Sequence, residues 1–207
     1  MDAQKYWEMV YRQKRASEVS WYQPRLELSL RLLAHAGLSE TSEMIDVGGG
    51  ASTLVDDVLA RGVRDVTVLD ISGHALAMAK TRLGQHADKV QWIEADVTQA
   101  GLPSNQYDLW HDRAVFHFLT GSDDRGRYLA ALHKALKPGG QLVIATFNLQ
   151  GPPRCSGLEV VRYSPETLQA ALGPSYRLLE AVDENHQTPF RTVQSFTYCR
   201  FQKVVAT

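Results

Sequence analysis

The sequence predicts an α/β fold in which helices cover both faces of a mostly parallel β-sheet. Three observations predict it: apolar stretches alternate with helical stretches, the first apolar stretch runs into a glycine-rich turn, and two β-like stretches close the chain. The 207 residues, 44% of them hydrophobic, suffice for one such domain and are too few for two typical ones. We therefore expect a single domain.

Five short apolar stretches are expected to form the parallel strands. Each is bounded by turn-forming or helical residues, as in a sheet buried on both faces. The expected strands are Met44–Val47, Val66–Asp70, Val90–Glu94, Tyr107–His111 and Leu142–Phe147.

Two leucine-striped segments are expected to be helices that pack on this sheet. One begins at Pro24 and ends at Gly37, and the other begins at Ser122 and ends before Pro138. Spacings of three and four residues put the leucines on one face of each helix. The leucines are Leu26, Leu30 and Leu33 in the first helix, and Leu129, Leu132 and Leu136 in the second.

The C-terminal part begins with a loop rich in glycine and proline, NLQGPPRCSG. Ser164 and Pro165 then predict the N-terminus of a short helix that reaches Leu172. Two β-like stretches follow, Tyr176–Asp183 and Thr192–Phe201. They are expected to form a terminal hairpin.

Composition argues against several classes of partner. Lysine and arginine number 22 against 23 aspartates and glutamates, so no net basic field favours nucleic acid or an anionic membrane. No run of about 18 apolar residues and no cleavable leader is seen, and we expect a cytoplasmic protein. Cys155 and Cys199 have no metal-site spacing and are expected to be reduced thiols.

The first strand runs into Gly48-Gly49-Gly50, and residues 53–60 continue as a helix. A glycine turn lets the backbone approach a ligand closely, and the helix N-terminus offers free N–H groups. By itself the pattern also describes an ordinary strand-to-helix turn, so further residues are needed to assign a ligand.

Acidic residues follow the next three strands. Asp70 lies 24 residues after Asp46, where a carboxylate can accept hydrogen bonds from both hydroxyls of a ribose. Asp96 follows the third strand, at a rim where an adenine amino group could donate to it. Asp112 ends the fourth strand, beside the crevice in which open α/β sheets bind ligands. NAD-dependent oxidoreductases share the first acid but do not usually have the pair of Asp70 and Asp96.

The chain resembles the class I S-adenosylmethionine (SAM)-dependent methyltransferases through five motifs in order: IDVGGGAS, VLDIS, EADVT, YDLWHDRAVFHFL and LKPGGQLVIATF. The resemblance implies SAM as cofactor. It also implies a Rossmann-like, doubly wound, seven-stranded sheet, mostly parallel with a C-terminal antiparallel hairpin. The chain departs from the family pattern at Ala51, a small residue where a third spaced glycine often stands.

The resemblance also implies roles for individual residues. Gly48 and Gly50 would line the cofactor, Asp70 would hold the ribose, and the adenine would lie between Asp96 and Val97. The cofactor-binding residues expected in this way are Trp21, Asp46, Gly48, Gly49, Gly50, Asp70, Ile71, Asp96, Val97 and Asp112. No metal-binding residue is expected.

The N-terminal segment YWEMVYRQKRASEVSWYQP resembles a narrower group, the thiopurine/tellurite-resistance and elongation-factor lysine methyltransferases. In that group the segment folds over SAM, so Tyr6, Trp7, Trp21 and Tyr22 are candidates for a lid. They could equally be ordinary packing aromatics. We therefore divide the domain into a helical lid (1–36), a SAM-binding core (42–147) and an acceptor-side loop with hairpin (148–207).

An amine or alcohol acceptor needs a base to remove a proton, whereas a thiolate does not. His111, Asp112 and His117 lie around the end of the fourth strand, and Asp112 and His117 are the catalytic candidates. For His117 the alternative is a buried helix histidine, and Asp112 could instead orient SAM. The loop after the fifth strand opens at the same edge and adds four acceptor-side candidates: Arg154, Cys155, Arg162 and Tyr163.

These observations favour methyl transfer from SAM to a small-molecule acceptor, because the chain is compact and lacks a basic face. The main alternative is a protein-lysine N-methyltransferase, although the fourth motif reads DRAVFHF and not the DKGT-type run of that group. A SAM-binding protein without catalysis is a further alternative. An NAD-dependent oxidoreductase is disfavoured by Asp96 and by the fifth-strand motif.

Overall fold

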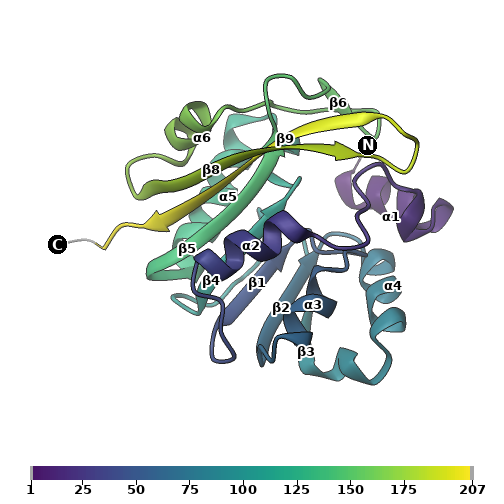
Figure 1. Ribbon diagram of the computed structural model, residues 1–207, viewed down its shortest axis with the longest axis horizontal. Helices are drawn as coiled ribbons and strands as arrows, with labels where there is room; N and C mark the ends of the chain where they lie inside the picture. The colour runs from purple at the N-terminus through teal and green to yellow at the C-terminus, as the bar shows by residue number, and fades with distance from the viewer. Residues whose placement is uncertain (1, 206–207) are drawn as a thin grey trace.

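The computed structural model describes residues 2–205, which build one seven-stranded sheet of order β3-β2-β1-β4-β5-β9-β8 (Figure 1). Strands β1 to β5 run parallel, β9 is antiparallel to β5, and β8 is antiparallel to β9. The strands are β1 (Glu43–Val47), β2 (Asp65–Asp70), β3 (Val90–Glu94), β4 (Tyr107–Arg113), β5 (Leu136–Phe147), β8 (Tyr176–Gln187) and β9 (Val193–Lys203). The sheet and its terminal hairpin confirm the fold expected from the sequence.

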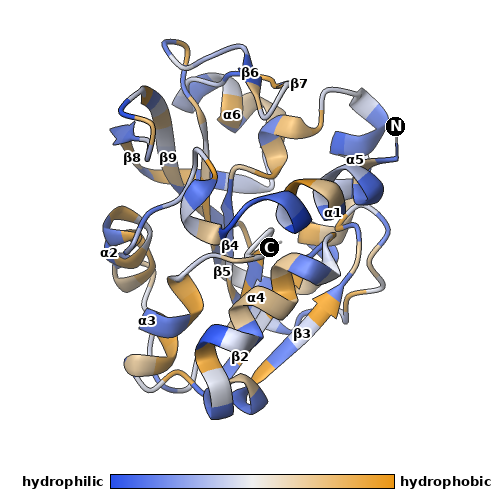
Figure 2. Ribbon diagram, turned by 90° about the vertical axis from the view of Figure 1, so that its right-hand side faces the viewer, coloured by the Kyte–Doolittle hydropathy of each residue, from blue (hydrophilic) through white to orange (hydrophobic). Residues whose placement is uncertain are grey.

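Helices cover both faces of this sheet. The α-helices are α1 (Ala3–Gln13), α2 (Glu27–His35), α3 (Leu54–Ala60), α4 (Gly73–Leu83), α5 (Ser122–Ala135) and α6 (Pro165–Leu172). One core cluster joins the sheet to α2 and α3, and a second joins it to α5 and α6. In Figure 2, α3 and α4 carry both hydrophobic and hydrophilic residues, as expected for helices with one buried face. The arrangement is the doubly wound one.

Within residues 2–205 there are also three short 3₁₀ helices: η1 (Ala16–Glu18), η2 (Gly84–Lys89) and η3 (Phe116–Phe118). In the C-terminal part, β6 (Arg154–Cys155) and β7 (Leu158–Glu159) form a separate two-stranded ribbon within the loop after β5. Ser164 caps α6 through a capping box with Thr167, which confirms the helix start read from the sequence.

Several element boundaries differ from the expected ones. Helix α2 begins at Glu27, not at Pro24, because the backbone of Leu26 is not helical (φ −90°, ψ 68°). Helix α5 buries Tyr128 and Leu132 but leaves Leu129 only partly buried. Strand β5 begins at Leu136, directly after α5, with an irregularity in its pairing to β4 that accommodates the Pro-Gly-Gly sequence.

The segment expected as a lid divides into two parts. Helix α2 buries Leu30 and Leu33 in the core and is a covering helix of the sheet. Residues 14–26, which we call the N-terminal strap, follow helix α1. Both α1 and the strap contribute residues to the hollows at the carboxyl edge of the sheet. Within the described residues, no helix combines the length and apolarity needed to cross a membrane.

Candidate functional site

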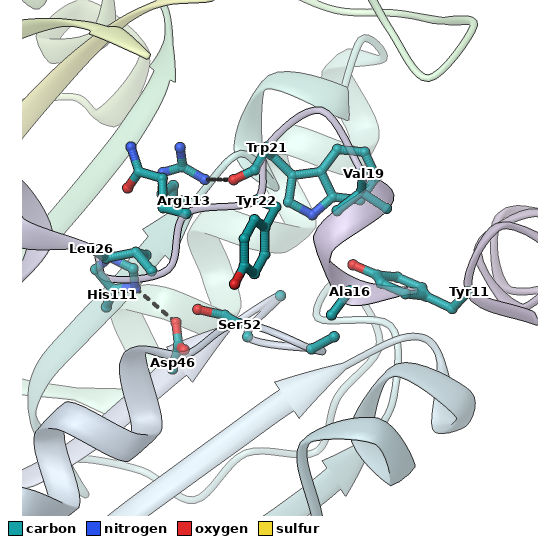
Figure 3. Close-up of a pocket in the computed structure, with 14 residues that line it drawn as sticks. Tyr11, Ala16, Val19, Trp21, Tyr22, Leu26, Asp46, Ser52, His111 and Arg113 are labelled. Atoms are coloured by element: carbon teal, nitrogen blue, oxygen red, sulfur yellow. Dashed lines mark hydrogen bonds and ion pairs between the residues drawn. The ribbon is translucent and has the colours of Figure 1, made fainter. Parts of the chain in front are cut away.

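A cavity of about 300 Å³ lies at the carboxyl ends of β1, β2, β3 and β4. Six of the expected cofactor residues line it: Trp21, Gly48, Asp70, Ile71, Asp96 and Val97. A smaller hollow of about 40 Å³ shares Tyr11, Trp21, Gly48 and Arg113 with the cavity, and it is lined in addition by Asp46 and Gly49 (Figure 3). Gly50 and Asp112 line neither hollow.

The glycine turn after β1 leaves no room for side chains. A Cβ at Gly48 would lie 2.0 Å from Val115 Cγ2, and one at Gly50 would lie 2.6 Å from Asp70 Oδ2. Both glycines have positive φ, +69° and +40° respectively, which other residues rarely adopt. The turn is anchored where the Gly48 N–H donates to the Leu69 carbonyl at 2.7 Å. Such a cradle suits a ligand held close to the backbone, as SAM would be.

Asp70 is almost completely buried at the end of β2, and its Oδ1 accepts a hydrogen bond from the Ser72 N–H at 2.8 Å. Burial raises the pKa of this carboxyl to about 7, and the neighbouring charges of Asp46 and Glu8 act in the same direction. Two hydroxyl donors, such as those of a ribose, would favour its charged form.

Asp96 begins the turn after β3 and is held by that turn. Its Oδ1 accepts from the backbone N–H and the hydroxyl of Thr98, both at 2.8 Å. The next residue, Val97, is buried. An oriented carboxylate beside an apolar side chain matches the adenine end that the resemblance implies.

Asp46 belongs to a buried chain of hydrogen bonds behind the glycine turn. Its Oδ1 lies 2.7 Å from His111 Nδ1 (Figure 3). On the other side of the ring, His111 Nε2 lies 2.9 Å from Ser29 Oγ. Both ring nitrogens of His111 are therefore engaged within the protein, so this histidine ties α2 to β1 and β4.

Asp112 is fully buried, and its carboxylate accepts three hydrogen bonds. The donors are the Tyr128 hydroxyl at 2.6 Å, the Val115 N–H at 2.9 Å and the Phe116 N–H at 3.1 Å. Burial raises its pKa to about 6, although these donors and His111 oppose the shift. The carboxylate thus fixes the turn after β4, and the structure does not bring it to either hollow.

His117 is also fully buried and lies outside the cavity wall. Its Nδ1 accepts from the Phe147 N–H at 3.2 Å, and its ring packs against Phe118 and Phe147. Burial, aided by the charge of Arg113, lowers its pKa to about 3. This placement corresponds to the alternative interpretation, a buried histidine that is neutral at neutral pH.

Aromatic side chains from the N-terminal segment form one wall of the cavity. The Trp7 ring lies 5.7 Å from Trp21 and 5.1 Å from Phe118, and Tyr11 lies 6.2 Å from Trp21. These aromatics therefore both pack and line the cavity. Of the other two lid candidates, Tyr22 lines the small hollow and Tyr6 lines neither.

Side chains of α1 hold this helix over the carboxyl edge. Glu8 Oε1 accepts from the Ser72 hydroxyl and the His74 N–H, both at 3.1 Å, at the N-terminus of α4. The Tyr6 hydroxyl donates to the Ser156 carbonyl in the ribbon loop. The N-terminal helix thus bridges the two sides of the cavity.

The four acceptor-side candidates lie in different environments. Cys155 lines the cavity, and burial raises its pKa to about 11, so it is a thiol. Arg154 is exposed in an ion pair with Glu159, and Arg162 donates to the carbonyls of residues 149 and 151. Tyr163 is buried against Phe116. Only Cys155 of the four reaches the cavity.

Sequence reasoning missed Arg113, which lines both hollows, and Phe118, which faces Trp7. The signal for Arg113 was its position directly after the acid at the end of the fourth strand. For Phe118 there was none, because its partner lies more than a hundred residues away in the chain.

Residues 45–144, from β1 into β5, match a family model described as a methyltransferase domain. The eEF1A lysine and N-terminal methyltransferase of Danio rerio is 26% identical over 144 residues, which are 68% of this chain and 21% of that protein. The ubiquinone/menaquinone biosynthesis C-methyltransferase UbiE of Psychromonas ingrahamii is 24% identical over 55% of this chain and 45% of its own. The match thus spans about a fifth of the length of the first relative and under half of the length of the second.

Solved structures share the fold over nearly the whole chain. The 1,6-didemethyltoxoflavin-N1-methyltransferase of Burkholderia thailandensis, solved with 1,6-didemethyltoxoflavin and S-adenosylhomocysteine, has a TM-score of 0.70 at 20% identity. The match covers 98% of this chain and 84% of that one. The N-methyltransferase NodS of Bradyrhizobium japonicum, in complex with S-adenosylhomocysteine, has a TM-score of 0.68 at 20% identity, covering 95% and 97%. Residues 45–144 thus match a methyltransferase domain, and the seven-stranded sheet with its glycine cradle beside Asp70 and Asp96 makes the chain similar to the class I SAM-dependent methyltransferases.

Proposed function

We propose that this chain transfers the methyl group of SAM to a small-molecule acceptor. The observation that carries the proposal is the aromatic wall: Trp7, Trp21 and Phe118 close the cavity from the side of the N-terminus. The middle of helix α1 is held on two sides, to α4 through Glu8 and to the ribbon loop through Tyr6. A small molecule fits a cavity walled on this side by aromatic rings, whereas a folded protein can insert no more than one side chain.

When bound, SAM supplies a methyl group already activated on a sulfonium. In this proposal Asp70 accepts hydrogen bonds from the ribose, and Asp96 and Val97 hold the adenine. The aromatic wall excludes water and aligns the acceptor, which is the main catalytic contribution such a transfer needs.

The catalytic roles expected for Asp112 and His117 are not part of this proposal. Both side chains are buried, and their hydrogen bonds go to the protein. Among the described residues that line the large cavity there is no histidine. We infer that Asp112 and His117 fix the turn after β4 and the end of β5, and that acceptor and methyl meet without a base from either residue.

A protein-lysine acceptor is the second candidate. It is favoured by the sequence match to an enzyme named for lysine and N-terminal methylation of eEF1A. The didemethyltoxoflavin methyltransferase is named for a small-molecule acceptor, and UbiE is named for ubiquinone and menaquinone biosynthesis.

Label transfer separates the two candidates. The protein is incubated with methyl-labelled SAM and either a metabolite extract or total protein, with Asp70→Ala as the control in both arms. The proposal expects label in molecules of low mass and little in protein. Label confined to protein would overturn the proposal in favour of a protein acceptor.

A further inference from the structure

The guanidinium of Arg113, at the end of β4, lines both hollows and is only partly satisfied by the protein. Its Nε donates to the Tyr198 hydroxyl at 2.7 Å and its Nη1 to the Trp21 carbonyl at 2.8 Å (Figure 3 shows the latter). The group lies over the Phe196 ring at 4.8 Å. Arginine has five N–H groups, and Nη2 is buried with no acceptor among the described residues.

The positive charge of Arg113 also lacks a direct counter-charge. No ion pair of the described residues includes it, and Glu184 is reached only through Tyr198, whose hydroxyl donates to Glu184 at 3.0 Å. Arg113 is partly buried, and a charged group that loses part of its hydration is stabilised when an anion pairs with it. An anionic group of a ligand would satisfy both the free N–H groups and the charge.

The small hollow identifies the chemistry of that ligand group. It is lined by a cation, Arg113, and by a carboxylate, Asp46, with Gly48 and Gly49 of the backbone turn also in its wall. At about 40 Å³ it suits the end of a ligand and not a whole one. Opposite charges around one small space match the α-amino-acid end of a zwitterion, and SAM carries such an end.

We propose that Arg113 binds the amino-acid carboxylate of the cofactor. Because Nη1 of the same guanidinium holds the Trp21 carbonyl, binding of this carboxylate also fixes the N-terminal strap. The inference concerns the cofactor and does not depend on which acceptor is methylated.

Two ligands that differ in this end test the proposal. S-adenosylhomocysteine has the amino acid, and 5′-methylthioadenosine lacks it. By calorimetry, Arg113→Met should weaken binding of S-adenosylhomocysteine by about 10- to 100-fold, as expected for a lost charged hydrogen bond. Affinity for 5′-methylthioadenosine should stay within about twofold. Arg113→Lys, which keeps the charge, should fall between.

A structural role for Arg113 predicts a different pattern. Tyr198→Phe removes the acceptor of Nε but keeps the guanidinium, so the affinity ratio of the two ligands should equal that of the wild type. Equal weakening of both ligands by Arg113→Met, or no weakening of either, would overturn the proposal. If Arg113→Met does not fold, Arg113→Lys decides by the same ratio.

Hydrogen exchange of residues 14–26 gives a second readout. S-adenosylhomocysteine should slow exchange in the strap more than 5′-methylthioadenosine does in the wild type. In Arg113→Met the two ligands should protect the strap equally. A difference that persists in the variant would contradict the coupling to Trp21.

Discussion

The two ends of the large cavity are built in different ways. At the end proposed to hold the cofactor, which we call the cofactor end, a backbone turn and two acids come from adjacent strand ends within residues 48–97. At the other end, Trp7, Trp21, Phe118 and Cys155 come from four separate parts of the chain and meet only through tertiary packing. The first end is constrained by backbone sterics, so a small substitution there should strongly weaken ligand binding. The second is held by side-chain contacts that can adjust.

The largest effect is expected from a single methyl group at Gly48. Gly48→Ala sets a Cβ 2.0 Å from Val115 at a φ of +69°, so the turn must shift. We expect binding of S-adenosylhomocysteine to weaken by at least about 100-fold, or about 3 kcal/mol. Calorimetry measures the affinity, and denaturant unfolding checks the fold.

Gly84→Ala is the matched control for Gly48→Ala. Gly84 also has a positive φ, +56°, but a Cβ there meets nothing within 4 Å. It should cost about 1 kcal/mol of stability and leave ligand affinity unchanged. Normal binding by Gly48→Ala would mean that the ligand does not lie on the glycine turn.

The next largest effect is expected at Asp70, where binding and stability should change in opposite directions. Asp70→Asn should weaken the binding of S-adenosylhomocysteine about tenfold or more, because the substitution removes charged hydrogen-bond acceptors. The pKa of Asp70 is raised from 3.8 to about 7, so between these values the folded protein keeps a proton that the unfolded chain has lost. This group therefore lowers stability as pH rises through that window.

Urea unfolding at pH 5 and pH 8 tests the stability effect of Asp70→Asn. The stability of the variant relative to the wild type should increase by about 1–3 kcal/mol from pH 5 to pH 8. Asp65→Asn, at the exposed start of the same strand, should show no such change. An unchanged pH dependence in Asp70→Asn would show that Asp70 is already charged at pH 5.

The cofactor end was largely predictable because each of its residues follows a strand in a short local motif. The end of β4 was not, although Asp112 and Arg113 are neighbours. Successive side chains of a strand point to opposite faces, and sequence does not show which of the two faces the cavity. In the structure Arg113 lines the hollows, whereas Asp112 accepts a hydrogen bond from Tyr128, a residue of α5. The next residue, Ala114, has a φ of +72°, a conformation that an alanine in the sequence does not predict.

A smaller effect is expected from the aromatic wall. Trp7→Ala removes contacts with Trp21 and Phe118, and neighbouring rings can partly fill the space. We expect a three- to tenfold weaker binding of S-adenosylhomocysteine, about 0.6–1.4 kcal/mol, by calorimetry. Met9→Ala, at an exposed position of the same helix, is the control and should bind normally. Equal affinities of Trp7→Ala and wild type would make this wall irrelevant to the cofactor.

The smallest effect on turnover is expected at His117, because its ring lies outside the cavity wall. His117→Asn retains an acceptor for the Phe147 N–H and should leave both limbs of the pH–rate profile in place. Loss of one limb near neutral pH would instead make His117 the base.

The stability of His117→Asn should change more than its turnover. The pKa of the histidine falls from 6.5 to about 3 on folding. Acidification below pH 6.5 therefore protonates the unfolded chain first and destabilises the wild type. The variant has no such group, so its loss of stability between pH 7 and pH 5, measured by urea unfolding, should be smaller by about 1–2 kcal/mol.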